Sequence, residues 1–359
     1  MILTVFMKYV SNQFLKHFIF LLLGLTAMLV VFDVLAHSKD VLANQNDALR
    51  GITFYIRLRL SSILNLVIPI SSFFALMILF TRLVKFHEME AFRSAGFSIY
   101  KIMRRLTPAI GGIIICHFIL ANTFLASDSR ILQGWQEREY SGNPWDASAP
   151  MIPDWVVVDN KLINVGSVGY NGKVLYDLKV IKRDESGKVL NSAKIDKAFY
   201  VDGKWRFLGF KDQEINSAEV PLVEKDVNLP FDPDAFLNLG ELEASLNIWQ
   251  LRRLVKNTKD VEPYKSRQYA LWFQRKLVGP LASYIMLILT LPLCFLVSRQ
   301  PNFVFYVFLT IFIGFSYYIA ERLLMSLGEA GHLPVMISAW APFALYAMSG
   351  FWVLFIKEP

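Results

Sequence analysis

Six long apolar runs, each nearly free of charged residues, alternate with polar stretches along the chain. The runs cover residues 18–35, 63–80, 106–126, 278–297, 303–320 and 333–356. A helix rises about 1.5 Å per residue, so even the shortest run spans roughly 27 Å, close to the hydrocarbon thickness of a bilayer. Only helices and closed barrels satisfy their backbone in lipid, and continuous runs of this length are typical of helices. The pattern therefore predicts six transmembrane helices in two groups of three.

A polar segment, residues 127–267, separates the two groups, and its pattern changes to that of short strands. Strands are predicted for residues 155–158, 174–181, 193–200 and 204–208. Dipeptides that favour tight turns stand between them, at Asn171-Gly172, Ser186-Gly187 and Asp202-Gly203. Such a series of hairpins indicates a β-sandwich or a jelly-roll-like sheet. Residues 241–265 are predicted to form a helix, with Asn247 as its candidate N-cap.

These elements predict an α+β membrane protein with a 3+3 arrangement of helices. Residues 1–126 are expected to hold the first three, residues 127–267 a large extracytoplasmic β-jellyroll-like domain, and residues 268–359 the last three. Basic residues gather before the first run and in the connection 81–105, which the positive-inside rule assigns to the cytoplasm. Six crossings return the chain to its starting side, so both termini are expected to be cytoplasmic. The cations of segment 36–62 go against the rule.

Composition excludes several other classes of protein. Apolar residues make up 54% of the chain and charged residues 19%, which is far too apolar for a disordered protein. Two cysteines are too few for a disulfide scaffold. The inserted segment from Asp128 to Lys265 carries 19 basic and 22 acidic residues, so the formal charge of +7 arises in the membrane part. That charge reflects topology, and no nucleic acid is expected as a partner.

Motifs for chemistry are absent from the sequence. The five histidines do not stand at metal-ligand spacings, and neither a Gly-rich phosphate loop nor a Gly-x-Ser-x-Gly elbow occurs. We therefore expect no catalytic residue, no metal and no cofactor, with any chemistry done by a partner. Two rival readings remain open: a membrane enzyme that modifies envelope lipids, and a sensor or scaffold whose β-domain binds a ligand.

A short segment between the second and third runs has a pattern of its own. Phe86, Met89 and Phe92 recur every three residues, which predicts a short amphipathic helix near residues 84–96. Gly96 stands where a C-cap glycine would end it. Exposed apolar side chains beside a bilayer need cover, either from the membrane surface or from a groove in a cytoplasmic partner.

The pattern Glu-Met-x-Ala-x-Arg-x-Ala-Gly, at Glu88 to Gly96, resembles the cytoplasmic coupling helix of the LptF/LptG permeases, the YjgP/YjgQ family. These are the membrane subunits of the ABC transporter that exports lipopolysaccharide. The resemblance covers nearly the whole chain and includes the 3+3 grouping around a middle domain. Further matches favour the LptG branch over LptF: Asp232-Pro-Asp-Ala, and Arg267-Gln-Tyr followed by Trp272, Lys276 and Pro280-Leu281.

The resemblance implies a location, a set of partners and a role for the coupling helix. The chain is expected in the cell inner membrane, paired with a second, LptF-like or LptG-like permease and driven by LptB-like ATPase subunits. LptC-like and LptA-like proteins are expected to form a periplasmic bridge for the lipopolysaccharide. Met89 and Phe92 are then apolar anchors on the ATPase, Glu88 and Arg93 are charged contacts, and Gly96 ends the helix. Permeases of another envelope lipid or of lipoproteins remain an alternative.

The resemblance also suggests a use for cations near the extracytoplasmic rim. A cavity for lipid A needs positive charge for the lipid phosphates. The candidates are Lys39, Arg57, Arg59, Arg130 and Arg322. The alternative is that these side chains only extend to water as interface anchors. Three polar residues lie inside apolar runs, Asp33, His117 and Asn122; hydrogen bonds between helices are favoured for the last two.

Overall fold

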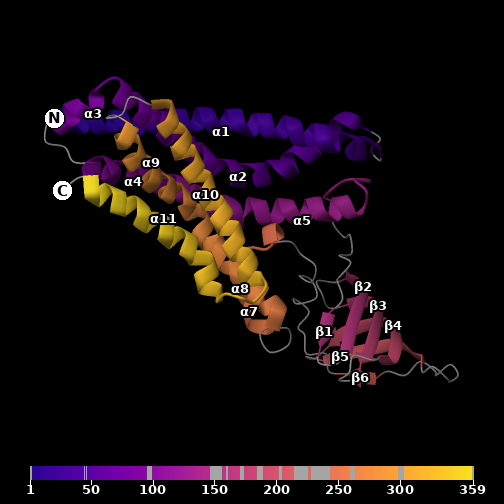
Figure 1. Ribbon diagram of the computed structural model, residues 1–359. Coiled ribbons are helices and arrows are strands. Elements are labelled where there is room, and N and C mark those ends of the chain that lie inside the picture. The colour runs from indigo at the N-terminus through magenta and orange to yellow at the C-terminus, as the bar shows by residue number, and fades with distance from the viewer. Residues whose placement is uncertain are drawn as a thin grey trace. The chain divides into compact units, whose positions relative to one another are not determined.

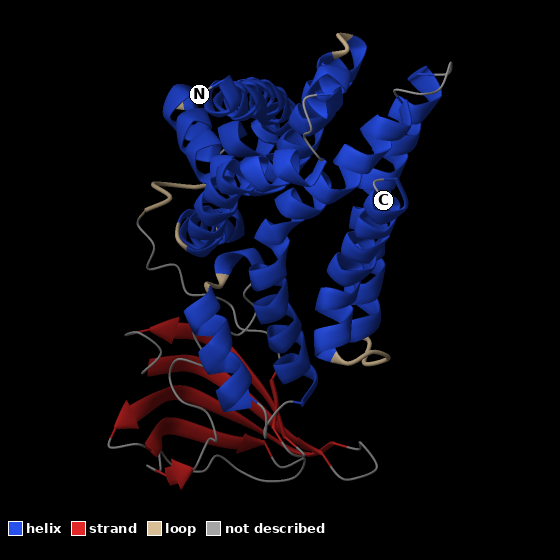
Figure 2. Cartoon of the chain, turned by 90° about the vertical axis from the view of Figure 1, so that its left-hand side faces the viewer, coloured by secondary structure: helices blue, strands red, loops and turns tan. Residues whose placement is uncertain are grey.

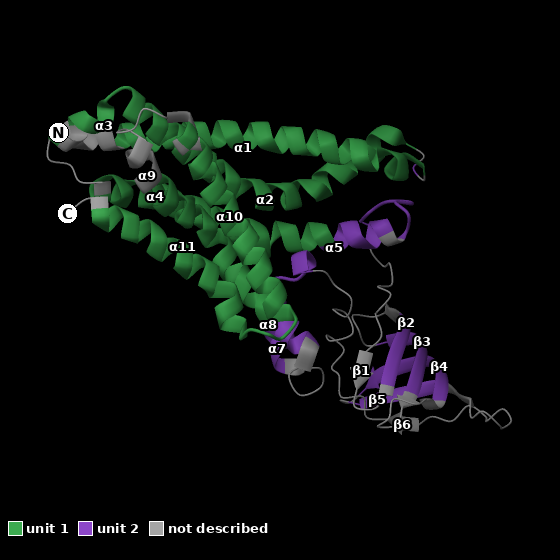
Figure 3. Cartoon of the chain, viewed as in Figure 1, with its two compact units in different colours: residues 1–43, 47–129, 270–359 green, residues 44–46, 130–269 purple. Residues whose placement is uncertain are grey.

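The computed structural model describes most of the chain: residues 2–43, 45, 47–94, 99–145, 156–158, 161–169, 174–183, 189–201, 204–213, 225–227, 243–258, 263–297 and 303–357. It divides into two compact units (Figure 3). Unit 1 contains Met1–Ala43, Asp47–Ser129 and Ala270–Pro359. Unit 2 contains Asn44–Asn46 and Arg130–Tyr269. Each unit is described by itself.

The first part of the chain forms two very long helices and three shorter ones. They are α1 (Ile2–Ala43), α2 (Ala48–Lys85), α3 (Glu88–Ser94), α4 (Ile99–Asn122) and α5 (Phe124–Glu137) (Figure 1). The carboxylate of Asp47 caps α2 by accepting from the backbone N–H groups of Leu49 and Arg50. At about 1.5 Å per residue, α1 and α2 are each roughly 60 Å long, about twice the hydrocarbon thickness. Both helices therefore reach well beyond a bilayer.

The last part of the chain forms four helices, of which the first two are separated by a tight turn. They are α8 (Pro263–Val278), the 3-10 turn η2 (Gly279–Leu281), α9 (Ala282–Val297), α10 (Phe303–Glu329) and α11 (Val335–Lys357). Pro280 lies in the 3-10 turn, and without an N–H it cannot donate the hydrogen bond that a continuous α-helix would have at this position. Within unit 1, α1 begins, α11 ends and α3 lies at the same end of the helix bundle (Figure 1).

Five described helical stretches are long and apolar enough to cross a membrane. They are Lys8–Ala43, Ala48–Lys85, Tyr100–Gln136, Phe308–Glu329 and Val335–Ile356. The predicted fourth run, residues 278–297, is divided by the turn at Pro280, and α9 has only 16 residues. Six uninterrupted spans are therefore not confirmed, because hydropathy alone does not register a backbone break inside an apolar run.

The core of unit 1 forms around α9 and the inner half of α2. Ile285, Met286 and Leu287 are three successive residues of α9, and all are 0% exposed. A helix that is apolar on all sides is buried on all sides. Helix α9 contacts α2, α4, α10 and α11, whereas α1 contacts chiefly α2.

Unit 2 contains one antiparallel sheet of six described strands (Figure 2). They are β1 (Val156–Val158), β2 (Lys161–Gly169), β3 (Val174–Arg183), β4 (Val189–Val201), β5 (Lys204–Gln213) and β6 (Lys225–Val227). The four predicted strands are confirmed, while β2 and β6 were not predicted. Each described strand pairs with its neighbours in sequence, so a two-sheet jelly roll is not confirmed. The three turn dipeptides lie outside the described residues.

One face of the sheet is buried. The alternation of buried and exposed side chains is interrupted at one position of β3. Leu175 and Leu178 are both 0% exposed although they are three residues apart. Between them Asp177 takes a positive φ of 53°, and it lies opposite Gly166 on β2. A Cβ on Gly166 would lie 2.9 Å from the Cβ of Asp177, so this position requires glycine. The irregularity keeps apolar side chains on one face along the whole strand.

The predicted helix after the sheet is present as α7 (Ile248–Thr258), preceded by the 3-10 turn η1 (Glu243–Ser245). Asn247 is confirmed as its N-cap. The Asn247 side chain accepts from the Gln250 N–H at 2.9 Å, and the Gln250 side chain accepts from the Asn247 N–H at 2.8 Å. This reciprocal pair is a capping box that satisfies two backbone donors.

Candidate functional site

The turn between α2 and α3 is built by the backbone at the end of α2. The N–H of Phe86 bonds to the Arg82 carbonyl at 3.0 Å, and the N–H of His87 bonds to the Val84 carbonyl at 3.1 Å. His87 has a positive φ of 55°, which reverses the chain into the seven residues of α3. We call residues 86–94 the coupling turn.

The coupling turn is fixed to unit 1 by one of the predicted anchors. Met89 is 3% exposed and belongs to the core cluster that includes Leu83 and Leu106. Its side chain therefore lies in the chain's own core and not on an outer surface, in contrast to the role that the sequence suggested. Phe86, at 63% exposed, is the large apolar side chain on the described outer surface of this turn.

The other predicted coupling residues are placed only in part. Glu88 is half-buried at the start of α3. Phe92 and Arg93 belong to α3, but their side chains lie outside the described part of the structure, and so does Gly96 as a whole. The three-residue spacing placed Phe86 in the apolar stripe, but it did not predict that the Phe86 side chain is the exposed one.

A polar cluster joins α1 and α2 near their other end. The Asp33 carboxylate accepts hydrogen bonds from the Tyr55 hydroxyl at 2.8 Å, from Arg59 Nε at 2.9 Å and from Arg59 Nη2 at 3.1 Å. The Asp33 side chain is 17% exposed and Tyr55 is 2% exposed. His37 donates from Nδ1 to the Asp33 carbonyl at 2.9 Å and packs beside the Tyr55 ring. We call Asp33, Tyr55 and Arg59 the Asp33 cluster.

The remaining predicted cations have different surroundings. Arg59 is paired with Asp33 in the cluster just described. Lys39, Arg57 and Arg322 are exposed, and Arg57 interacts electrostatically with Asp128. Arg130 is half-buried and belongs to unit 2, so it is not described relative to the other four.

Two polar side chains inside apolar runs form hydrogen bonds through one of their polar atoms. His117 on α4 is 4% exposed, and its Nε2 lies 3.1 Å from the Asn65 side-chain oxygen on α2. The sequence predicts such a hydrogen bond between helices for His117. The Asn122 amide donates to the Phe118 carbonyl of its own helix at 2.9 Å.

Three successive side chains of α8 bond to three other helices of unit 1. Gln274 accepts from the Trp340 indole on α11 at 3.0 Å, and Arg275 pairs with Glu321 on α10 at 3.2 Å. Lys276, only 7% exposed, donates to the Ala121 carbonyl at 3.2 Å. This carbonyl lies in the last turn of α4, where the partial negative charge of a helix end attracts a cation. The sequence singled out Lys276 in its motif, but without a role.

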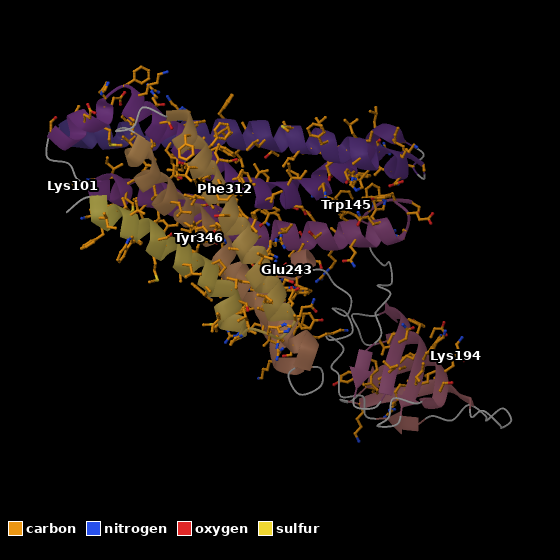
Figure 4. All side chains as sticks on the ribbon, in the orientation of Figure 1. Lys101, Trp145, Lys194, Glu243, Phe312 and Tyr346 are labelled. Carbon is orange, nitrogen blue, oxygen red and sulfur yellow. The ribbon has the colours of Figure 1, made fainter. Side chains whose placement is uncertain are left out.

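The outer helices expose apolar side chains. On α10, Phe312 is 71% exposed (Figure 4). On α11, Trp352 is 69% exposed. Tyr346, on the inner side of α11, hydrogen-bonds to the Ser316 hydroxyl of α10 at 2.7 Å (Figure 4). Among the residues that the structure describes, no group of His, Cys, Asp and Glu could hold a metal ion. The exposed apolar surface requires lipid or another apolar chain as cover.

Long apolar helices with apolar outer faces and paired polar groups between them define an integral membrane protein. A sequence model of the family described as lipopolysaccharide export system permease LptF/LptG matches residues 8–356. The chain therefore belongs to the LptF/LptG family, which confirms the resemblance at the level of the family. The match does not separate the two branches. A comparison with curated protein sequences finds no match.

Proposed function

We propose that this chain is one permease half of an ATP-driven exporter that extracts lipopolysaccharide from the outer leaflet of the inner membrane. The observation that carries the proposal is the family match over residues 8–356. A second permease of the same family forms the other half, and the pair encloses a cavity for the acyl chains. Of the two branches, the motif before α9 favours LptG.

ATP hydrolysis belongs to a separate cytoplasmic subunit in this proposal. The sequence has no phosphate-binding loop, so the chain needs an external motor. With the coupling turn on the cytoplasmic side, both chain termini lie there as well. Phe86 and Glu88, together with Arg93, contact the ATPase, while Met89 fixes α3 to the permease core and transmits its movement to α2 and α4.

On the other side of the membrane the chain passes lipopolysaccharide to a bridge of β-folded proteins. Among the described strands, β1 and β6 are the edge strands of the sheet of unit 2, and in this proposal one of these edges pairs with a neighbouring β-fold. The exposed cations Lys39, Arg57 and Arg322 remain candidates for contacts with lipid A phosphates, and so does Arg130. Arg59 is the weakest of the five candidates because its charge is already paired.

The test is to purify the chain with its co-expressed partners and to measure ATP-dependent release of lipopolysaccharide from proteoliposomes. Phe86→Ala is expected to lower both the recovery of the ATPase and the release. Leu49→Ala is the matched control, since Leu49 is 79% exposed on the same helix, roughly 55 Å from Phe86 at about 1.5 Å per residue.

Glu88→Ala and Arg93→Glu are expected to uncouple ATP hydrolysis from release. Wild-type release in all three coupling-turn variants would refute the assignment of this turn to the motor. Turnover of an envelope lipid by the purified chain without ATP would instead support the membrane-enzyme alternative.

A further inference from the structure

The Asp33 cluster presents a carboxylate with three donors in a largely apolar setting. Asp33 lies inside the apolar run of α1, and its carboxylate receives both the Nε and the Nη2 of one guanidinium. Two parallel N–H···O bonds fix both the distance and the orientation of the two side chains. The buried Tyr55 hydroxyl adds a third bond from α2. The geometry thus connects α1 to α2 through a single acid.

An isolated charge at this position would be costly. Ionisable groups inside membrane spans pair with one another, because lipid provides no water to solvate them. Removing one partner of a buried pair leaves the other charge without compensation, whereas replacing both by apolar residues is often nearly neutral. The arrangement therefore predicts opposite outcomes for single and paired substitutions.

Helix α1 packs mainly against α2, and many large apolar side chains of the same stretch lie outside that contact. Large side chains from Ile19 to Leu35 are exposed, among them Phe20 at 76% and Phe32 at 58%. The buried residues Val10, Phe14 and Phe18 attach the beginning of α1 to the core at least 15 residues before Asp33, and Val41, 1% exposed, is buried eight residues after it. The polar contacts at Asp33 lie between these buried positions and add directional bonds to the packing of α1 on α2.

We propose that Asp33, Tyr55 and Arg59 form a polar pin that makes α1 and α2 move as one body, and that Arg59 is a positioning residue and not a ligand of the substrate. The pin has no net charge. Arg57, two residues earlier on α2 and exposed, keeps its position outside the pin. The existence of the pin does not depend on the proposed function. Only the measurement of lipopolysaccharide export in the test below rests on that function.

The experiment measures the distance between spin labels on α1 and α2 by pulsed electron spin resonance. Labels replace Leu35 and Leu60, which flank the pin and are 66% and 37% exposed, in a chain with Cys116→Ser and Cys294→Ser. Asp33→Asn and Arg59→Met are each expected to broaden the distance distribution in detergent without lipopolysaccharide. Tyr55→Phe is expected to broaden it less.

Two paired variants keep the test decisive even if a single variant folds poorly. Asp33→Arg with Arg59→Asp restores an ion pair in reverse order and is expected to recover a narrow distribution and most of the export. Asp33→Leu with Arg59→Met removes both charges and is expected to fold but to show a broad distribution. Arg57→Met is the matched comparison, with an unchanged distribution.

Two results would overturn the pin. One is an unchanged distance distribution in Arg59→Met together with weaker photocrosslinking of lipopolysaccharide, which would make Arg59 a substrate ligand. The other is a charge-reversed pair that stays as broad as the single variants. If the chain exports no lipopolysaccharide at all, the proposed function fails while the label distances still decide on the pin.

Discussion

Gly350 provides a direct test of the packing between α11 and α9. A methyl group at this position would lie 2.6 Å from the Ile288 Cγ2 and 3.0 Å from the Ile288 carbonyl oxygen. Ile288 is 1% exposed and branched at Cβ, and one of the two contacts is with backbone. The carbonyl oxygen cannot move aside by a side-chain rotation, and rotation of the Cγ2 about χ1 is restricted because a β-branched residue in a helix strongly prefers one rotamer, so Gly350→Ala is expected to push the two helices apart.

Two opposing effects set the magnitude for Gly350→Ala. Overpacking of a tight core costs about 1–3 kcal/mol. Replacing glycine by alanine inside a helix recovers up to about 1 kcal/mol of that loss. We therefore expect a net decrease of up to about 2 kcal/mol in the free energy of unfolding, because the clash is the larger of the two effects. The helix-propensity gain alone would have the opposite sign.

The assay is reversible unfolding in mixed micelles, followed by the fluorescence of the eight tryptophans. Gly111→Ala on α4 is the matched control, because a Cβ there meets nothing within 4 Å. The control is expected to be as stable as the wild type or slightly more stable. A Gly350→Ala variant that matches this control would show that α9 and α11 do not pack as closely as described.

Two other substitutions test local contacts. Asn247→Ala removes the capping box of α7 and is expected to cost about 1 kcal/mol, measured as faster hydrogen exchange in the first turn of the helix, whereas Asn247→Asp should preserve it. Glu321→Leu removes the ion pair between Glu321 and Arg275 and is expected to lower the unfolding free energy more than Glu321→Leu combined with Arg275→Met. Equal losses in these two variants would contradict a pairing role for Glu321.

The helices could be predicted from the sequence because apolar runs report burial in lipid directly. The break before α9 could not be located by the same signal. Hydropathy sums side-chain character over a window, and Pro280 changes the backbone without making the window polar. Pro69, Pro108 and Pro342 lie inside continuous helices, so a proline in an apolar run does not by itself locate a break.

The ion pair between Asp33 on α1 and Arg59 on α2 was not predicted, although the spacing of the two residues along the chain contained a signal for it. Asp33 stands twelve positions before Gln45 and Arg59 fourteen positions after it. Two antiparallel helices joined at such a tight connection bring residues at similar distances from the turn to the same level. This arithmetic places the acid at the level of residues 57–59, and so near both Arg57 and Arg59, without choosing between the two cations.

The coupling turn illustrates a limit of amphipathic patterns. A three-residue spacing places Phe86 and Met89 on related faces of a helix, but it does not say what covers each of them. The positive φ at His87 separates the two residues, so that Phe86 ends α2 while Met89 begins the packing of α3. Spacing across a helix boundary therefore carries no information about a common face.

The contacts of α1 determine how unit 1 can change shape. Helix α9 packs against four other helices, so it cannot shift without disturbing the core, whereas α1 contacts chiefly α2. A peripheral helix of this kind moves either together with its neighbour or by giving up that contact. If the pin is intact, α1 cannot give up its contact with α2. Any opening beside α1 must then occur on the face that carries Phe20 and Phe32. An apolar opening there suits acyl chains, whereas an opening between α1 and α2 would expose Asp33 and Arg59 to them.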